Sequence, residues 1–454
     1  MEFMTDFETL KRYGLFDAKV PRYTSYPPAN RFSSTDGQIY QKTWLSAVPD
    51  ESAVSVYIHI PFCKRLCWFC ACRTQGTKTM RPVEAYVKTL LQEIESVRQR
   101  LPRAIKMARL HLGGGTPTIL EPKTMRSLLD AVFAAFDTAD DFEFSVEVDP
   151  TEASPELLRT LAEFGMNRAS IGVQDFDPKV QIAIGRQQTL EQTTCVVDQL
   201  RSLGVRSLNF DLLYGLPHQS ESGLLNTLNA AAGLSPDRIA LYGYAHVPWM
   251  SKRQVLIDGS ALPDTATRFS MAEQAKNVLT AEGYDPVGID HFALPDDSLA
   301  IASVQGNLRR NFQGYTDDTS QVLIGLGASA ISRFPQGFSQ NTPATSAYQQ
   351  RIAREGFAGH RGFAMSVHDK VIARMIESLM CAFSIDERTL FDEFPDQVPE
   401  IRSAVLSLQG EFPDLFDPVG DLLQLREHAK PLVRIIAHRI DQFAKEGIGY
   451  STAI

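Results

Sequence analysis

Four of the six cysteines lie within ten residues, between Cys63 and Cys72. The first three have the spacing C-x₃-C-x₂-C, with Cys67 and Cys70 as the second and third members. The thiolate form of cysteine binds metals, and nearby positive charge stabilises that form. Three basic residues supply such charge, namely Lys64, Arg65 and Arg73. The segment therefore predicts a metal-binding loop.

The spacing of these cysteines favours an iron–sulfur cluster over a zinc ion. A structural zinc site needs four ligands, and the remaining cysteines, Cys195 and Cys381, are isolated in the sequence. Closely spaced thiolates hold iron–sulfur clusters. Three thiolates on a four-iron cluster leave one iron open, which is what a catalytic metal requires. A zinc knuckle is the alternative, and the role of Cys72 is left open.

Predicted strands and helices alternate along the chain from the segment before the cysteine loop. Apolar runs predict strands at 54–60, 108–112, 142–148, 168–173, 207–213 and 238–244. Helical periodicity predicts helices at 82–101, 122–136, 154–165, 188–203 and 220–233. Six such units predict an α/β fold with a parallel sheet, arranged as an open or closed barrel.

Glycine, proline or polar residues stand at the end of every predicted strand. The first strand runs into the cysteine loop, and the others run into Gly113–Pro117, Glu147–Pro150, Gly172–Asp175, Asp211–Pro217 and Tyr244–His246. Because α/β barrels place their chemistry at the carboxyl ends of the strands, we expect one active site at this mouth.

Several of these residues have physical properties that suit ligand binding. The glycine triplet at 113–115 lets a ligand approach the backbone closely. The carboxylates of Glu147 and Asp211 can accept hydrogen bonds from hydroxyl or ammonium groups. Phe69 offers a flat apolar face. For Asp149 and Asp175 we expect helix N-caps instead.

Bulk properties exclude several classes of protein. A length of 454 residues suits a barrel with additions. The net charge of −9 does not favour nucleic-acid binding. No run of 18 apolar residues predicts a membrane span, and the charged N-terminus lacks the apolar core of a signal peptide. Cysteine usage fits a reducing cytoplasm.

The motifs resemble those of radical S-adenosylmethionine enzymes. Tyr57–Phe62 (YIHIPF) precedes the three-cysteine loop, and Cys72 adds a C-x-C step, as in the family of oxygen-independent coproporphyrinogen III oxidases. Further matching segments are Pro21–Pro27 (PRYTSYP), Gly113–Pro117, Asp290–Ala293, Arg309–Tyr315 and Gly325–Ser332. The chain departs from the family pattern at two positions, Ala71 and Leu112, neither of which removes a ligand.

The resemblance implies a reaction. A [4Fe–4S] cluster would generate a 5′-deoxyadenosyl radical from S-adenosylmethionine. The radical would start oxidative decarboxylation of two propionates of coproporphyrinogen III, giving protoporphyrinogen IX in haem biosynthesis. An unidentified electron donor and electron acceptor would take part. The chain would act as a monomer.

The resemblance also implies roles for individual residues. The cluster ligands would be Cys63, Cys67 and Cys70. A first S-adenosylmethionine would contact Tyr57, Gly114, Glu147 and Ile331. A second would contact Phe69, Gly115, Thr116, Gln174, Arg186, Asp211 and Ala245. Besides Tyr57, positions linked to activity are His59, Phe312 and Gln313.

The same resemblance divides the chain into three parts. Residues 1–50 would form an arm covering the substrate site, with an extended PRYTSYP stretch. Residues 51–365 would form an open (β/α)₆ barrel with an extension, in which 264–282 is helical. Residues 366–454 would form a mainly helical C-terminal domain. Local cations would bind the substrate carboxylates, with candidates Arg22, Lys64, Arg65, Arg73, Lys78 and Arg309.

Two other interpretations compete with this enzyme. A haem-binding chaperone of the related non-decarboxylating branch shares the cysteine loop and the barrel, but typically lacks the C-x-C step and the PRYTSYP stretch. A zinc-stabilised interaction protein would contain zinc without iron or sulfide.

Overall fold

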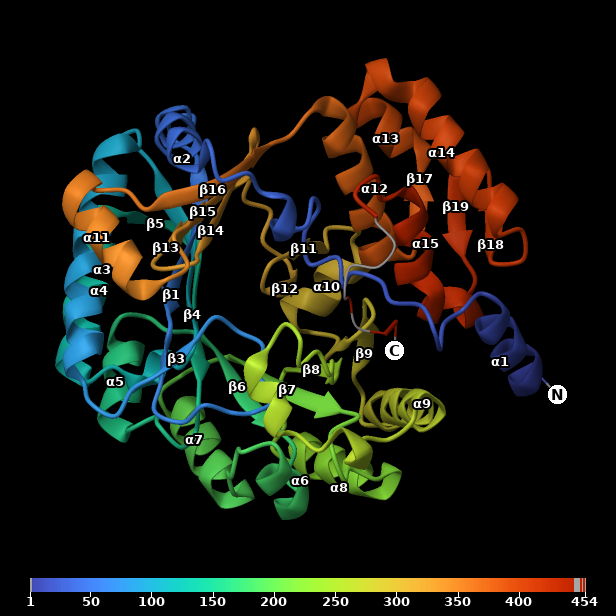
Figure 1. Cartoon of the computed structure of the whole chain (residues 1–454), viewed down its shortest axis with the longest axis horizontal. Coiled ribbons are helices and arrows are strands. Elements are labelled where there is room, and N and C mark those ends of the chain that lie inside the picture. The colour runs from blue at the N-terminus through green and yellow to red at the C-terminus, as the bar shows by residue number, and fades with distance from the viewer. Residues whose placement is uncertain (1, 445–449, 451, 454) are drawn as a thin grey trace.

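A single twelve-stranded sheet organises the molecule, and its six central parallel strands form an open barrel (Figure 1). The computed structural model describes residues 2–444, 450, 452 and 453. The sheet has the strand order β16-β15-β14-β13-β1-β4-β5-β6-β7-β8-β10-β9. The C-terminal domain lies across the open side of this curved sheet (Figure 1).

The central strands confirm the predicted six-unit α/β barrel. They are β1 (Ala53–Ile60), β4 (Lys106–Gly114), β5 (Asp137–Val148), β6 (Arg168–Gln174), β7 (Ser207–Tyr214) and β8 (Arg238–Gly243). Neighbouring strands in this group pair in parallel, so all six carboxyl ends face one mouth.

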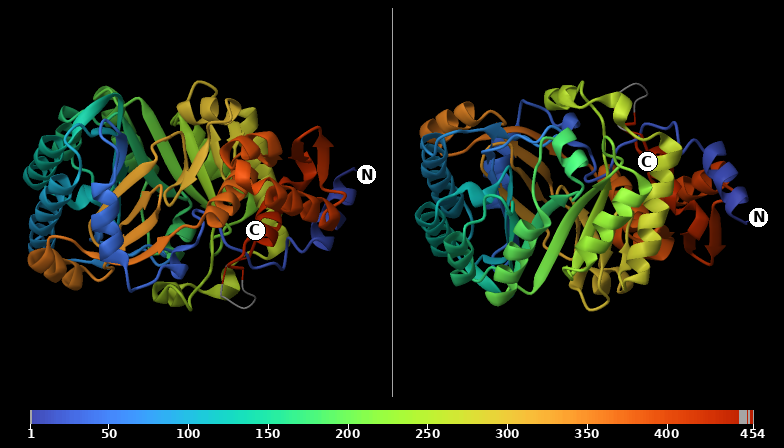
Figure 2. Two further views of the ribbon diagram at one scale, coloured as in Figure 1. Left: turned by 90° about the horizontal axis from the view of Figure 1, so that it is seen from above. Right: turned by 90° about the horizontal axis from the view of Figure 1, so that it is seen from below.

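Helices between these strands cover the outer face of the sheet (Figure 2). They are α3 (Arg81–Arg100), α4 (Pro122–Ala135), α5 (Pro155–Glu163), α6 (Pro178–Ala183), α7 (Leu190–Ser202) and α8 (Glu221–Ala232). In α3, Val83, Val87, Leu90 and Ile94 are buried, as their helical spacing predicts.

The sheet is wider than the sequence predicts. On one edge β13 (Val322–Leu326) pairs in parallel with β1, followed by antiparallel β14 (Ile331–Phe334), β15 (Gly337–Asn341) and β16 (Gly359–Ala364). On the other edge are β10 (His291–Ala293) and β9 (Asp285–Val287). These strands are short, and most carry glycine or polar residues. Helix α9 (Thr265–Ala281) agrees with the prediction, whereas α10 (Ser298–Val304) and α11 (Thr345–Glu355) are additional.

The N-terminal segment contains two helices that were not predicted, while its PRYTSYP stretch is non-helical, as expected. Helices α1 (Glu2–Arg12) and α2 (Gly37–Ser46) flank the PRYTSYP stretch, which itself is neither helix nor strand. Leu10, Leu15 and Tyr26 pack into the apolar core of the C-terminal domain. Leu10 of α1 is therefore buried by the C-terminal domain, which is distant from it in the sequence.

The C-terminal domain is mainly helical and also contains a small sheet. Its helices are α12 (Val367–Ala382), α13 (Glu387–Glu393), α14 (Val398–Glu411) and α15 (Val433–Ile440). Strands β17 (Ser384–Asp386), β19 (Leu422–Leu425) and β18 (Phe416–Val419) form the sheet, in that order. The predicted domain extends to residue 454, so part of its end lies outside the described residues. No helix within those residues is long and apolar enough to cross a membrane.

Two buried side chains of α3 fix the loop between β13 and β14 beside the barrel mouth. Glu93 accepts hydrogen bonds from Gly327 N at 2.7 Å, Tyr348 Oη at 2.7 Å and Asn341 Nδ2 at 2.6 Å. The Tyr86 hydroxyl accepts from Ala328 N at 2.8 Å. Burial raises the pKa of Glu93 from 4.5 to about 7, although these hydrogen bonds oppose the rise.

Because the pKa of the buried Glu93 carboxyl is raised, we expect the free energy of unfolding to decrease as the pH rises. Its contribution is complete below pH 4.5, where the carboxyl of the unfolded chain is protonated, and is lost as the pH passes 7. The difference corresponds to about 3 kcal/mol. We expect Glu93→Gln to show a smaller decrease in unfolding free energy between pH 5 and pH 8, measured by urea denaturation. Glu95→Gln, on the exposed face of the same helix, should retain the wild-type pH dependence, and an equal decrease in both variants would contradict this assignment.

Candidate active site

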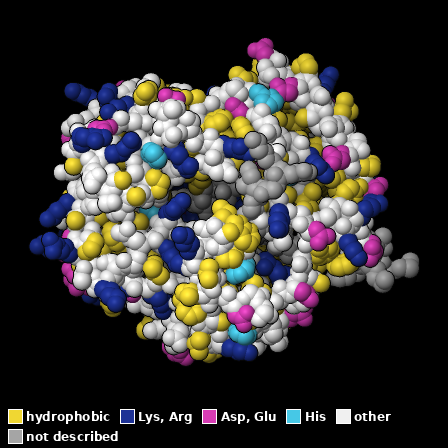
Figure 3. All heavy atoms as spheres, in the orientation of Figure 1, with side chains coloured by type: hydrophobic (Ala, Val, Ile, Leu, Met, Phe, Trp, Pro, Cys, Tyr) yellow, Lys and Arg dark blue, Asp and Glu magenta, His cyan; other side chains and the backbone are white. Residues whose placement is uncertain are grey.

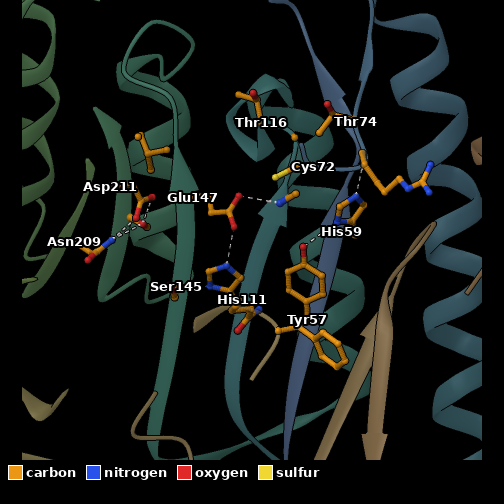
Figure 4. Close-up of a pocket in the computed structure, with 18 of the residues that line it drawn as sticks. Tyr57, His59, Cys72, Thr74, His111, Thr116, Ser145, Glu147, Asn209 and Asp211 are labelled. Atoms are coloured by element: carbon orange, nitrogen blue, oxygen red, sulfur yellow. Dashed lines mark hydrogen bonds and ion pairs between the residues drawn. The ribbon is translucent and has the colours of Figure 1, made fainter. Parts of the chain in front are cut away.

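A cavity of about 640 Å³ opens at the carboxyl ends of the parallel strands. The cysteine loop, the glycine-rich end of β4, the end of β5 and the β13–β14 loop all contribute to its lining. Figure 4 shows Tyr57, His111, Glu147 and Asp211 projecting from neighbouring strands toward the same space. The predicted single active site at this mouth therefore has a cavity to occupy.

The cysteine loop is held at its two ends and along its outer side. Strands β2 (Phe62–Cys63) and β3 (Gln75–Gly76) pair in parallel and close its base. The Gln254 side-chain amide donates to Phe69 O at 2.8 Å, and Ser251 Oγ donates to Cys70 O at 3.1 Å. Trp68 N donates to Ile184 O at 2.9 Å. These bonds fix the loop backbone, so its side chains meet the cavity in one arrangement.

A buried guanidinium joins the cysteine loop to the strand ends. Arg186 Nη1 lies 3.6 Å from Cys67 Sγ and 3.1 Å from Asp149 Oδ2. Its Nη2 donates to Gly172 O at 2.7 Å. Burial alone would lower the pKa of Arg186, but the charge of Asp149 and the nearby thiols keep it raised. Asp149 thus serves an ion pair rather than the helix N-cap predicted for it.

Asp175, the other predicted N-cap, is also used differently. It is buried and accepts hydrogen bonds from Gln219 Nε2 at 2.6 Å and Thr227 Oγ1 at 3.0 Å. The caps of the neighbouring helices come from Ser154 for α5 and Asp177 for α6. Asp175 therefore fixes the β6–α6 turn to the β7–α8 connection.

The three thiols predicted as ligands line one wall of the cavity, and all are free of disulfides. Their electrostatic settings differ. A hydrogen bond from the Cys72 thiol lowers the pKa of Cys70 to about 6, and the charges of Arg253 and Arg186 contribute, while burial opposes them. Burial raises the pKa of Cys63. Positive charge near Cys70 favours the thiolate that a metal needs.

The arrangement of these thiols suits a polynuclear cluster. Within the described residues no three Cys, His, Asp or Glu side chains gather closely enough to hold a single metal ion. In a four-iron cluster each thiolate binds its own iron, so the sulfurs need not converge on one point. Three thiols facing the same cavity as a glycine-rich strand end therefore fit the [4Fe–4S] cluster.

The end of β4 is shaped for close approach to the backbone. Gly114 has φ +116°, and a Cβ there would lie 2.5 Å from the His59 ring. Its N–H donates to Glu147 Oε2 at 2.9 Å. Burial acts to raise the pKa of Glu147, but hydrogen bonds from His111 and Gly114 outweigh it and keep the pKa below its ordinary value. Glu147 is thus an ionised acceptor facing the cavity.

A short hydrogen-bonded series runs along β1 beneath the cysteine loop. Tyr57 Oη lies 2.9 Å from His59 Nδ1, and His59 Nε2 lies 3.1 Å from Arg73 O (Figure 4). Burial lowers the pKa of His59 and raises that of Tyr57. Both rings are therefore neutral at pH 7, and together they link the strand to the far end of the cysteine loop.

Most of the other predicted residues also line the cavity. Members of this group are Phe69, Gly115, Thr116, Gln174, Asp211, Phe312, Gln313 and Ile331. Asp211 accepts from Ser170 Oγ and Asn209 Nδ2, each at 2.9 Å, and burial raises its pKa. Phe312 and Gln313 form the turn between β11 (Arg309–Asn311) and β12 (Gly314–Thr316). Ala245 is not part of the cavity lining, although its carbonyl accepts from the same Gln254 amide that holds Phe69 O.

Sequence reasoning missed the polar residues deeper in the barrel. They line the cavity from inside the strands rather than from strand ends: Arg109, His111, Glu143, Ser145, Arg168, Ser170, Asn209, Tyr242 and His291. Most are two residues apart within otherwise apolar strands, which places them on the inner face. The alternation of polar and apolar residues within the strands is visible in the sequence, but the prediction considered only the residues at the strand ends.

The six predicted carboxylate-binding cations do not form one group. Arg65 and Arg73 line this cavity, whereas Arg22 lines a second one. Lys64 pairs with Glu152 at 2.5 Å and Arg309 with Glu377 at 3.3 Å. Lys78 is exposed.

The fold and the cysteine loop define a radical S-adenosylmethionine protein. The model of the radical SAM superfamily matches residues 57–231, and proteins of this superfamily use a [4Fe–4S] cluster and S-adenosylmethionine. A solved structure of coproporphyrinogen III oxidase from Escherichia coli, described as a radical SAM enzyme, superimposes with a TM-score of 0.89 at 33% identity. That match covers 94% of this chain and 100% of the other.

Relatives match the chain over nearly its whole length. The oxygen-independent coproporphyrinogen III oxidase of Paracoccus denitrificans is 49% identical over 98% of this chain and 99% of its own. That of Cereibacter sphaeroides is 48% identical over 99% of this chain and 100% of its own. The chain belongs to the family of oxygen-independent coproporphyrinogen III oxidases.

Replacing the ionised acceptor at the end of β5 tests its predicted contact with S-adenosylmethionine. Glu147→Gln removes the charge but keeps the size of the side chain. We expect S-adenosylmethionine to bind about tenfold to a hundredfold more weakly, because hydrogen bonds to a charged partner are the stronger ones. Isothermal titration of the cluster-loaded protein measures this, with iron and sulfide content as the check on the cluster.

Glu143 provides the matched control, because it lies on the same face of β5, about 13 Å down the strand. It faces Arg168 at 3.4 Å. Glu143→Gln should bind S-adenosylmethionine as the wild type does. Equal weakening in both variants would show that Glu147 makes no specific contact.

Proposed function

We propose that this chain catalyses the oxygen-independent oxidative decarboxylation of two propionates of coproporphyrinogen III, giving protoporphyrinogen IX. One observation carries the proposal. Three free thiols, the glycine-rich end of β4 and the ionised Glu147 face a single cavity, in a chain 49% identical to a named oxidase over 98% of its length.

Each round of the reaction balances without oxygen. A propionate side chain loses one hydrogen atom, carbon dioxide and one electron, and becomes a vinyl group. Bound S-adenosylmethionine, when reduced through the cluster, supplies the radical that accepts the hydrogen atom. The electron leaves to an acceptor that is not yet identified, and another unidentified carrier supplies the reducing electron.

The protein would contribute the positions of the reactants. Cys63, Cys67 and Cys70 would hold the cluster. A first S-adenosylmethionine would lie against Tyr57, Gly114, Glu147 and Ile331, all of which line the cavity. The neutral pair of Tyr57 and His59 adds no charge to this region, so Glu147 would be the anion available for an ammonium group.

We also propose a second S-adenosylmethionine. Of its predicted contacts, Ala245 lies outside the cavity lining. Arg186 is already engaged by Asp149, Gly172 and Cys67. Its role would therefore be to position the cysteine loop. Phe69, Gly115, Thr116, Gln174 and Asp211 line the cavity and stay candidates.

The competing haem-chaperone interpretation has less support, because the relatives named above are oxidases that match almost end to end.

We propose that the enzyme acts as a monomer in the cytoplasm. Six free cysteines fit a reducing compartment.

An anaerobic assay tests the proposed function. Reconstituted, reduced protein is incubated with S-adenosylmethionine and coproporphyrinogen III, and the oxidised products are separated and weighed by mass spectrometry. We expect tricarboxylic and dicarboxylic porphyrins that depend on S-adenosylmethionine. Cys67→Ser should abolish them, because the loss of one thiolate removes a cluster ligand.

Cys195→Ser is the matched control, because Cys195 is an exposed cysteine on α7 that does not line the cavity. It should retain full activity. Unchanged tetracarboxylic porphyrin from wild-type protein with an intact cluster would refute the oxidase and favour the haem chaperone.

A further inference from the structure

A second cavity, of about 830 Å³, lies beside the active site and has no role in the account above. Its walls come from the N-terminal arm, the end of β8, α9, the β9–β10 hairpin and the C-terminal domain. We call it the arginine cavity, after three of its lining residues, Arg22, Arg310 and Arg434. The face shown in Figure 3 is hollowed near its centre, inside the curve of the barrel sheet, and Lys and Arg side chains border that hollow.

Positive charge exceeds negative charge at the inner end of this cavity. The three arginines are opposed there by one carboxylate, Asp290, which already pairs with His291 at 2.7 Å. At the outer end the charges balance, because two lysines, Lys276 and Lys430, face two carboxylates: Glu427, which both contact, and Glu273. Buried charge without a counter-charge is costly, so the inner end is suited to an anionic ligand.

One of the arginines has side-chain N–H groups that donate to no described residue. Arg310 stacks on the Tyr315 ring at 4.3 Å, and its Nη2 donates to Arg22 O at 3.2 Å. Its Nε and Nη1 are shielded from solvent and have no hydrogen-bond partner among the described residues. Nη2 of Arg22 donates to Gly243 O at 2.6 Å. A guanidinium with free donors can bind a carboxylate.

Arg434 differs, because backbone carbonyls occupy its donors. Nε and Nη2 donate to Pro21 O at 3.0 Å and Val20 O at 2.7 Å, and Nη1 donates to Ala453 O at 3.0 Å. Burial and the charges of Arg22 and Arg310 lower its pKa to about 9. Arg434 therefore holds the arm in place and adds charge, while Arg22 and Arg310 are the groups able to contact a ligand.

The remaining lining is apolar and aromatic. It includes Phe7, Leu10, Leu15, Leu241, Phe269, Phe292 and Phe383. The two cavities share His291 in their walls, so at that point a single side chain separates them. The first cavity, of about 640 Å³, is filled by one or two cofactor-sized molecules. A large macrocycle bound at the same time would therefore need space outside it.

We propose that the arginine cavity binds the tetrapyrrole substrate through the propionate carboxylates that are not reacting. The pyrrole rings would lie against the apolar walls, with carboxylates on Arg310 and Arg22. The reacting propionate would pass the His291 wall toward the S-adenosylmethionine site. This inference rests on the proposed function for its ligand, and it assigns the N-terminal arm a direct part in substrate binding.

Titration with coproporphyrin III, the stable oxidised form of the substrate, tests the assignment without catalysis. Binding is followed by porphyrin fluorescence on the full-length chain. We expect Arg310→Gln and Arg22→Gln each to raise the Kd roughly tenfold to a hundredfold. Arg310→Lys should recover part of the affinity. Wild-type protein should bind the tetramethyl ester of coproporphyrin III as weakly as the Gln variants bind the acid.

Arg309→Gln is the matched control. Arg309 precedes Arg310 on β11, pairs with Glu377 and lines neither cavity. It should bind coproporphyrin III like the wild type. Urea denaturation of every variant identifies any change caused by unfolding, and the ester comparison on wild-type protein decides the matter if Arg310→Gln does not fold.

The outcomes separate this inference from the proposed function. If wild-type protein forms vinyl products but both Gln variants bind coproporphyrin III with wild-type affinity, the cavity assignment is wrong and the function stands. Equal binding of acid and ester by wild-type protein would also overturn it. If no vinyl products form, the function is wrong, and selective loss of acid binding in the Gln variants would still establish the anion site.

Discussion

A buried arginine at the barrel mouth couples the metal-binding loop to the sheet. The guanidinium of Arg186 must be paired where it lies, and it finds its partners in Asp149 at the end of β5, Gly172 O in β6 and Cys67 in the loop. Breaking a buried pair is far more costly than omitting one. The position of the cysteines relative to the strand ends therefore depends on this buried interaction, together with the backbone hydrogen bonds that hold the loop.

Parallel register then determines which chemistry can share the mouth. The six strands bring Cys63, Gly114, Glu147 and Asp211 to one edge although they are far apart in sequence. The same register carries alternate polar residues into the barrel interior, so polar side chains line the cavity along its depth. The ionised acceptor near the mouth and the hydrogen-bonded floor follow from one pattern.

Much of this was predictable because it is local. The cysteine spacing, the helical period of α3 and the apolar strands are each visible within about twenty residues. The arginine cavity was not, since Arg22, Arg310 and Arg434 come from three distant segments. Arg22 and Arg310 lie in segments that match the family, but nothing in those segments indicates that the three side chains meet. Helix α1 was missed for a similar reason: its apolar residues pack on the C-terminal core. Short strands such as β9 and β10 exist only through their neighbours.

Isotope transfer tests the central claim most directly, that the radical formed in the barrel cavity takes a hydrogen atom from a propionate of the substrate. Coproporphyrinogen III deuterated on its propionate side chains is converted anaerobically, and the 5′-deoxyadenosine formed is analysed by mass spectrometry. The account predicts deuterium in the 5′-deoxyadenosine, in step with the vinyl groups produced. Vinyl products accompanied by unlabelled 5′-deoxyadenosine would contradict it, because the hydrogen atom would then have left the substrate by another route.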